Sequence, residues 1–185
     1  IKRNSHQSIL KSNQNLFSKI LESTKKINSI LELGCNIGLN LESLKRISKK
    51  FELFGIEINK KACEIAQKKD IAKIINSTIT EEIKLEQVFD FVFTKGVLIH
   101  INPKDLKIVY KNIFDLSSKY ILLAEYYNPQ PVSIDYRGKK NLLFKRDFAG
   151  ELMDLYKLKL IDYGFVYHRD NYFPKDDITW FLLEK

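Results

Sequence analysis

Apolar and polar positions along the chain follow two periods in turn, and together they predict a repeated strand–helix order. Short apolar runs, as expected of buried parallel strands, occupy residues 29–34, 52–57, 72–75, 89–94 and 120–125. Between them, apolar residues recur at helical spacing over 7–27, 38–48, the segment around Ala62–Ala66 and the segment that begins at Pro103. This alternation is typical of an α/β protein with a doubly wound parallel sheet and helices on both faces.

The C-terminal part of the pattern differs from the rest. Strand-like runs over 160–167 and 177–184 are separated only by residues 168–176, which is too short for a helical crossover. We therefore expect these two strands to pair antiparallel, in a seven-stranded sheet that is otherwise parallel. A further helix is predicted to begin near Asp147, which would cap it, with Phe148, Leu152 and Leu155 facing inward.

The most informative segment is residues 30–40, a short apolar strand that runs into a glycine-bearing turn and then into a helix. Glycine lets the backbone approach a ligand closely, and a helix N-terminus offers unpaired N–H groups. Glu57 ends the next strand nineteen residues after Gly38, the spacing expected of an acid that binds a ribose. Asn36 stands between the two glycines, and Asn tolerates left-handed backbone geometry. A dinucleotide needs a closer backbone approach, so Asn36 disfavours a dinucleotide ligand.

Composition narrows the function classes. The chain has 185 residues, 44% of them hydrophobic, and a formal net charge of +8, which fits one soluble domain over residues 1–185. The lysines are scattered and form no basic stripe interleaved with aromatics, so a nucleic-acid partner is disfavoured. Two cysteines are too few for a disulfide framework or a cysteine-rich zinc site, and no apolar run is long enough to span a membrane. We expect a cytoplasmic protein.

Several motifs carry a resemblance to a known family. With ELGCNIG at 32–38, the acid Glu57 and FDFVF at 89–93, the chain resembles S-adenosylmethionine (SAM) dependent methyltransferases over nearly its whole length. TKGVLIHINP at 94–103, AEYYNP at 124–129 and FKRDFAGEL at 144–152 look like the small bacterial methylases associated with pseudaminic acid biosynthesis and related surface-glycan loci. The resemblance implies a class I, Rossmann-like methyltransferase fold, SAM as cofactor, S-adenosylhomocysteine (SAH) as product, and no metal.

The same resemblance implies a set of cofactor-binding residues. Gly34 and Gly38 should shape the loop under the methionine half of SAM, with Glu32 and Cys35 near its ammonium. Glu57 should accept hydrogen bonds from the ribose hydroxyls, and Ile58 should pack on the adenine. The remaining expected cofactor contacts are Asn36, Ser77, Thr78, Ile79, Thr94, Lys95 and Gly96.

Residues 125–176 are predicted to form the acceptor region, because they leave the fifth strand at the ligand-binding edge of the sheet and are dense in polar groups. Planar guanidinium groups there suit a carboxylate or phosphate, as in a nonulosonic acid or a nucleotide-linked sugar. The candidate acceptor-binding residues are Tyr127, Asn128, Tyr136, Arg137, Lys145, Arg146 and Arg169. A hydroxyl acceptor also needs a base, and the candidates are His100, Tyr126, Glu125 and His168.

The leading interpretation is a SAM-dependent methyltransferase that acts on O or N of a small, anionic, sugar-type metabolite. Because the chain begins at Ile1 without Met, we expect upstream residues that complete an N-terminal helix or lid formed by residues 1–28. Three alternatives stay open. A nucleic-acid or protein methyltransferase would show a contiguous basic face, a non-catalytic SAM-binding regulator would lack a usable base, and a nucleotide-sugar dehydrogenase would bind NAD.

Overall fold

A seven-stranded sheet forms the centre of the molecule. The computed structural model describes residues 6–136 and 139–185. The strand order is β3-β2-β1-β4-β5-β9-β8. The strands are β1 (Ser29–Leu33), β2 (Glu52–Glu57), β3 (Lys73–Asn76), β4 (Phe89–Lys95), β5 (Ser117–Glu125), β8 (Lys159–Val166) and β9 (Ile178–Glu184). The first five are parallel, and β9 is antiparallel to both of its neighbours. The predicted sheet and its antiparallel C-terminal pair are confirmed.

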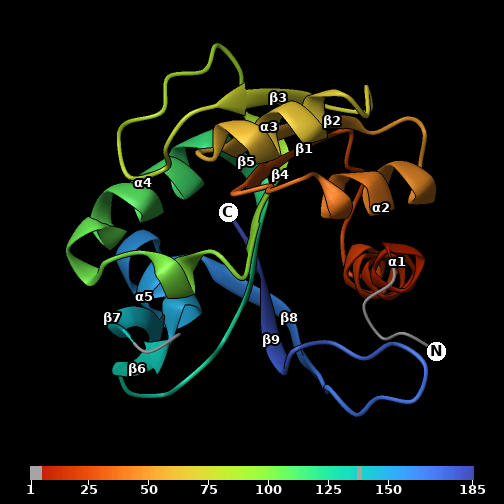
Figure 1. Ribbon diagram of the computed structural model, residues 1–185. Coiled ribbons are helices and arrows are strands. Elements are labelled where there is room, and N and C mark those ends of the chain that lie inside the picture. The colour runs from red at the N-terminus through yellow and green to blue at the C-terminus, as the bar shows by residue number, and fades with distance from the viewer. Residues whose placement is uncertain (1–5, 137–138) are drawn as a thin grey trace.

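Helices cover both faces of this sheet (Figure 1). One core joins the sheet to α1 (His6–Glu22), α2 (Leu39–Ile47) and α3 (Lys60–Gln67). The other core joins it to α4 (Leu106–Leu116) and α5 (Phe148–Tyr156). Two short 3₁₀ turns, η1 (Leu98–His100) and η2 (Pro103–Asp105), precede α4. Because both faces are covered, the central strands are apolar on both sides, as the continuous apolar runs of the sequence indicate.

A two-stranded hairpin outside the main sheet was not expected from the sequence. It consists of β6 (Val132–Tyr136) and β7 (Lys139–Lys145), which pair antiparallel. The sequence Val132-Ser133-Ile134-Asp135-Tyr136 does alternate between apolar and polar types, so the period-2 signal of a strand was present and was overlooked, although residues 132–135 are exposed. Only this hairpin, within the predicted acceptor region, stands apart from the seven-stranded sheet in the described part of the chain.

One expectation for α5 is wrong. Leu155, predicted to face inward, is 57% exposed, whereas Phe148 and Leu152 are buried as predicted. The helix ends at Tyr156, and the ring of Tyr156 packs inward instead, stacked on Phe114 with ring centroids 4.1 Å apart. The aromatic ring buries more apolar surface than a leucine side chain, so it occupies the inward position on the last turn.

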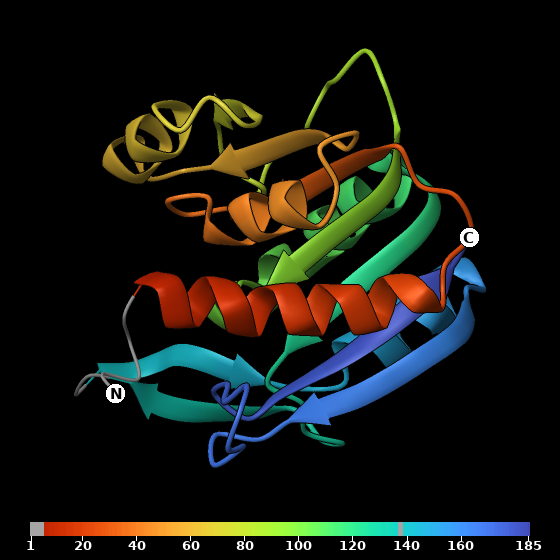
Figure 2. The same ribbon diagram turned by 90° about the vertical axis from the view of Figure 1, so that its right-hand side faces the viewer.

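The carboxyl ends of the parallel strands point toward the viewer in Figure 1, and they point to the left in Figure 2. The loops that follow β1, β2, β3 and β4 therefore gather on one side of the molecule. Helix α1 runs across the sheet beside the loop that joins β8 to β9 (Figure 2), and the Ser12 hydroxyl donates to the Pro174 carbonyl at 3.1 Å. This edge is where open parallel sheets hold ligands.

Candidate cofactor site and acceptor region

The turn after β1 has the backbone geometry that its sequence predicts. Gly34, Asn36 and Gly38 are all left-handed, with φ of 79°, 48° and 76°. The N–H of Gly34 donates to the Ile56 carbonyl at 2.8 Å, which ties the turn to the end of β2. A Cβ at Gly34 would lie 2.6 Å from a methyl carbon of Val97, so a side chain at position 34 would clash as well as strain the backbone.

Glu57 fixes this turn from the neighbouring strand. Its side chain is buried, with 8% exposure. One carboxylate oxygen accepts from the Asn36 N–H and the other from the Asn59 N–H, both at 2.7 Å. Each carboxylate oxygen can accept a second hydrogen bond, so both retain capacity for ligand hydroxyls. Glu57 therefore organises the loop and still presents acceptors.

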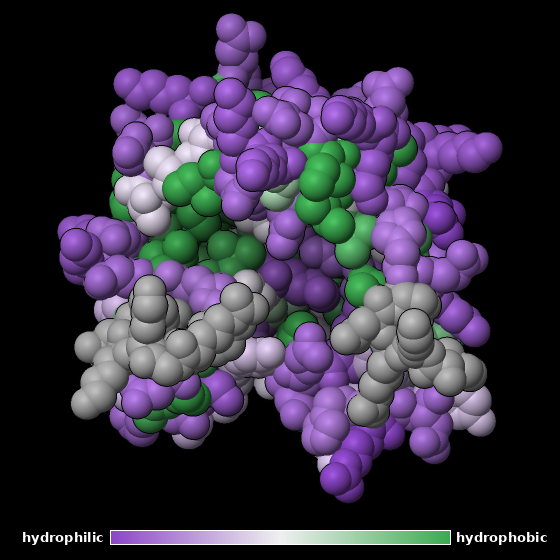
Figure 3. Space-filling model, in the orientation of Figure 1, coloured by the Kyte–Doolittle hydropathy of each residue, from purple (hydrophilic) through white to green (hydrophobic). Residues whose placement is uncertain are grey.

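Two cavities meet at the turn. The first has a volume of about 340 Å³ and the second about 290 Å³. The first, here called the Glu57 cavity, is lined by Gly34, Asn36, Ile56, Glu57, Ile58, Ser77, Thr78, Ile79, Thr80, Gly96, Val97, His100 and Ile101. The second, here called the Asn13 cavity, is lined by Ile9, Asn13, Gly34, Cys35, Asn36, Ile37, Leu39, Asn40, Lys95, Gly96 and Val97. They share four residues, and Figure 3 shows a hollow at the middle of this face, bordered by hydrophobic and hydrophilic side chains.

Most residues expected to bind a cofactor lie in these two linings. The exceptions are Glu32, Gly38 and Thr94, which are buried beneath them. Asn40 lines the Asn13 cavity and donates to one Glu32 oxygen at 2.5 Å. The other Glu32 oxygen is buried and has no hydrogen-bond partner among the described residues. Burial raises the pKa of Glu32 well above its usual value, against the opposing effects of Asn40 and Lys95.

Two lysines lie at or next to the Asn13 cavity: Lys95, an expected cofactor contact, and Lys175, which the sequence analysis missed together with Asn13. Lys95 lies at the end of β4, and burial lowers its pKa although Glu32 and Asp176 oppose that shift. Lys175, from the β8–β9 loop, donates to the side-chain oxygen of Asn13. Burial, together with the nearby Lys95, lowers the pKa of Lys175 to about 7. No local pattern could have revealed a contact between residues 13 and 175, because it depends on how the two ends of the chain pack.

Glu125, a candidate base, holds the turn after β4. It is 4% exposed, and the Val97 N–H donates to its two oxygens at 3.0 and 3.1 Å. Burial raises the pKa of Glu125 to about 7, while the amides of Val97, Leu98 and Ile99 act in the opposite direction. This carboxyl group positions the segment that lines both cavities.

The other three candidate bases lie in different parts of the structure. His100 belongs to η1 and lines the Glu57 cavity. Tyr126 is half-buried, and the Lys145 ammonium lies 5.1 Å from its ring centroid. His168 begins the β8–β9 loop, where its Nδ1 lies 2.8 Å from both oxygens of Asp177. Tyr126 and Lys145 are thus brought together, and His100 lies apart from them on the lining of the Glu57 cavity.

The expected acceptor-binding residues are largely engaged with their own surroundings. Arg146 Nε donates to Glu151 at 2.5 Å, and the other Glu151 oxygen accepts from the Tyr110 hydroxyl at 2.7 Å. Tyr127 lines a small gap together with Arg146. Asp147 caps α5 by accepting from the Gly150 N–H, as the sequence predicts. Asn128 is half-buried and donates to the Gln130 carbonyl at 2.6 Å, Arg169 is exposed, and Arg137 and the side chain of Tyr136 lie outside the described residues.

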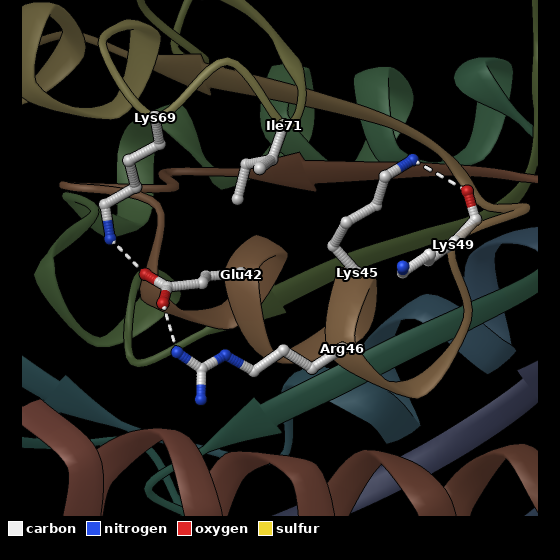
Figure 4. Close-up of a pocket in the computed structure, with 6 residues that line it drawn as sticks. All are labelled: Glu42, Lys45, Arg46, Lys49, Lys69 and Ile71. Carbon is white, nitrogen blue, oxygen red and sulfur yellow. Dashed lines mark hydrogen bonds and ion pairs between the residues drawn. The ribbon is translucent and has the colours of Figure 1, made fainter.

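A third, open groove of about 730 Å³ lies between α2 and the turn after α3, and it shares no residue with the two cavities (Figure 4). Three of its four cationic side chains, those of Lys45, Arg46 and Lys69, are bound within the protein. Glu42 pairs with Lys69 at 2.5 Å and with Arg46 at 2.9 Å, and the Lys45 ammonium donates to the carbonyls of Lys49 and Phe51. Such a groove is a solvated structural network and provides no free basic stripe.

Among the described residues, no group of His, Cys, Asp and Glu side chains is arranged to hold a metal ion. None of the helices described combines the length and apolar character needed to cross a membrane.

Comparison with known proteins agrees with this geometry. Residues 30–119 match the family model described as a methyltransferase domain, whereas curated proteins give no significant sequence match. Magnesium protoporphyrin IX methyltransferase from Synechocystis, solved with bound SAM, is 13% identical with a TM-score of 0.69, over 97% of this chain and 79% of that one. A SAM-dependent methyltransferase from Clostridium acetobutylicum is 12% identical with a TM-score of 0.69, over 97% and 92%. A glycopeptide N-methyltransferase in complex with SAM is 10% identical with a TM-score of 0.67, over 93% of each.

The comparisons establish the fold of the chain. The chain has the Rossmann-like fold of class I SAM-dependent methyltransferases, and its residues 30–119 match their methyltransferase domain. The predicted fold class is confirmed.

Proposed function

We propose that the chain binds SAM across the two cavities and transfers its methyl group to a small anionic acceptor. The observation that carries this proposal is the junction of the Glu57 and Asn13 cavities at one left-handed glycine turn. A buried carboxylate faces the first cavity and polar side chains line the second, which matches a nucleoside joined to an amino acid. The adenosine would occupy the Glu57 cavity and the methionine part the Asn13 cavity.

The residues present fit this cofactor. Gly96 has φ of 67° and no atom within 4 Å of the position of a Cβ, so space is open where the two cavities join. Asn40 lines the Asn13 cavity and donates to one oxygen of the buried Glu32. The other Glu32 oxygen has no partner among the described residues and would accept a hydrogen bond from the ammonium of the methionine part. Glu57 would bind the ribose hydroxyls, while Ile58, Ser77, Thr78 and Ile79 would surround the adenine. When bound, SAM supplies a methyl group on a positively charged sulfur.

The chain's own residues would then position the acceptor and exclude water. Helix α1 and the β8–β9 loop lie against each other over the Asn13 cavity, which supports a lid role for the N-terminal helix. Holding the acceptor close to the methyl donor can lower the barrier greatly without covalent help. For a hydroxyl acceptor, Tyr126 and His168 are the candidates to take the proton, since Glu125 is engaged by backbone amides.

The acceptor is proposed to be a sugar-type anion from the cytoplasmic stage of surface-glycan synthesis. Support comes from the resemblance to pseudaminic acid-associated methylases and from the basic residues Lys145 and Arg169 in the region of 125–176. Two buried free cysteines, Cys35 and Cys63, fit a reducing compartment. The similar structures act on porphyrin and glycopeptide acceptors, so the acceptor class of this chain rests on its own residues.

The proposal is tested by calorimetric titration with SAM, SAH and, as control, NAD. We expect both sulfur compounds to bind and NAD to give no heat of binding. Nonulosonic acids and their nucleotide-linked forms would then be screened for SAM-dependent methylation, with oligonucleotides and peptides as controls. Absence of SAM and SAH binding would overturn the cofactor assignment, and methylation of oligonucleotides or peptides alone would overturn the acceptor class.

A further inference from the structure

The two ends of the chain meet at one wall of the Asn13 cavity. Asn13 of α1 lines the cavity and is 1% exposed. Its side-chain oxygen accepts from the ammonium of Lys175, which the β8–β9 loop brings to that position. The neighbouring bond from the Ser12 hydroxyl to the Pro174 carbonyl, at 3.1 Å, anchors the same loop on the same helix. Asn13 is thus part of the cavity wall, Lys175 lies directly behind it, and a second bond holds the loop in place.

The electrostatic surroundings of this wall suit a negatively charged ligand. Lys95 lines the same cavity, and its charge, together with burial, disfavours the charged form of Lys175. Lys95 has three carboxyl groups acting on it, Glu32, Asp176 and Glu125, whereas only Asp176 acts on Lys175 in the described part of the chain. An anionic ligand beside Lys175 would offset the repulsion between the two ammonium groups.

The opposite wall offers the complementary charge. There, Asn40 lines the cavity and donates to one oxygen of Glu32, and the other oxygen of this buried carboxyl has no partner among the described residues. Glu32 and Lys175 thus each lie one residue behind the cavity lining, Glu32 behind Asn40 and Lys175 behind Asn13. An amino acid carries both an ammonium and a carboxylate on one carbon, and it matches this arrangement.

We propose that Lys175, positioned by Asn13, binds the α-carboxylate of the methionine part of the cofactor. The proposal rests on the proposed function, because it assumes that the methionine part enters the Asn13 cavity. On this basis the N-terminal helix and the C-terminal loop together recognise the amino-acid end of SAM. The chain would then discriminate between nucleosides that carry the amino acid and nucleosides that lack it.

The test uses SAH and 5′-methylthioadenosine, which keeps the nucleoside and sulfur but lacks the amino acid. Both are titrated by calorimetry into the wild-type chain, Lys175→Met, Lys175→Arg and Asn13→Ala. We expect Lys175→Met to weaken SAH binding ~10- to 100-fold, the range of one hydrogen bond between charged groups, and to leave 5′-methylthioadenosine within twofold. Lys175→Arg should restore part of the loss, and Asn13→Ala should weaken SAH alone by a smaller factor.

The matched control is Lys11→Met. Lys11 is an exposed lysine of the same helix as Asn13, and its ammonium lies 5.8 Å from the ring centroid of Phe173 in the same loop, whereas the Lys175 ammonium donates to the cavity-lining Asn13. Lys11→Met should leave the affinity for both ligands unchanged. An unchanged SAH affinity in Lys175→Met, or an equal loss for both ligands, would overturn the carboxylate assignment while the proposed function stands. A wild-type chain that binds neither ligand would overturn the proposed function itself. If Lys175→Met does not fold, the ratio of SAH affinity to 5′-methylthioadenosine affinity in Lys175→Arg and Asn13→Ala tests the carboxylate assignment instead.

Discussion

The two halves of the sheet differ in how far the polar side chains near them are paired within the protein. In the cofactor half, formed by β1 to β4 and their loops, Glu57 keeps capacity for further hydrogen bonds and one oxygen of Glu32 is unpartnered within the described structure. In the acceptor half, formed by β5 to β9 with α5, Arg146 is paired with Glu151, and His168 with Asp177. Around the turn after β1, the first half leaves acceptor capacity open on two buried carboxyl groups, whereas the second half pairs Arg146 and His168 internally.

This difference shows what a pattern of residue types can and cannot establish. A dense set of charges at the ligand edge predicts an acceptor site equally well whether the charges face a ligand or one another. The cofactor half is less ambiguous, because its signal lies in backbone geometry. The left-handed φ angles at Gly34, Asn36 and Gly38 leave few other uses for that turn.

The largest expected effect is that of Glu57→Ala on cofactor binding. This change removes the acceptor for the N–H groups of Asn36 and Asn59 and, by the proposed function, for two ribose hydroxyls. Hydrogen bonds to charged groups contribute ~1.5–3 kcal/mol each, so SAH affinity should fall by ~100-fold or more. Calorimetric titration measures the loss. Glu52→Ala, an exposed acid at the start of the same strand, is the control and should change nothing. An unaltered affinity in Glu57→Ala would remove the ribose assignment.

The sequence was sufficient for the seven-stranded sheet and for the left-handed turn after β1 because both depend on local patterns. Apolar runs, the glycine turn and the acid at the end of β2 are each readable within a few residues of chain. The parts that were missed depend on packing between distant segments. Asn13 and Lys175 meet only because α1 crosses the sheet beside the β8–β9 loop. Leu155 was misplaced because helical spacing alone does not show that Tyr156 takes the inward position.

The buried carboxyl group of the acceptor half should make stability depend on pH. The pKa of Glu125 rises from 4.5 to about 7 on folding, so the folded state holds a proton that the unfolded state has lost in this range. The associated stability is complete below pH 4.5 and is lost as pH rises through about 7, by roughly 3 kcal/mol in total. Urea unfolding at several pH values should show this decline in the wild-type chain and a flatter profile in Glu125→Gln. Glu52→Gln is the matched control, and an identical slope in Glu125→Gln would show that Glu125 is ionised when folded.

Arg146→Ala tests directly whether the ion pair between Arg146 and Glu151 stabilises the acceptor half. The change leaves Glu151, which is partly buried, without its cation, and we expect a loss of about 1–2 kcal/mol in the free energy of unfolding. SAH affinity should stay within twofold. The control is Arg46→Ala, which breaks a more exposed i,i+4 pair with Glu42 and should cost about 0.5 kcal/mol or less. If Arg146→Ala is as stable as the wild-type chain, its guanidinium is free for an acceptor and the contrast between the two halves fails there.

The smallest expected effects come from two equivalent helix caps, one in each half. Asn59 accepts from the Ala62 N–H at the start of α3, and Asp147 accepts from the Gly150 N–H at the start of α5. Alanine at either position should cost about 1 kcal/mol, measured by urea unfolding. The two caps differ in what lies next to them, because the backbone N–H of Asn59 also donates to Glu57. Alanine keeps this N–H, but loss of the side-chain cap loosens the start of α3 that positions it, so Asn59→Ala should weaken SAH binding severalfold, while Asp147→Ala leaves it unchanged. If both variants change SAH affinity equally, destabilising either half weakens cofactor binding. The two halves would then differ in their hydrogen bonds and ion pairs, but their stabilities would be coupled to the cofactor site to the same extent.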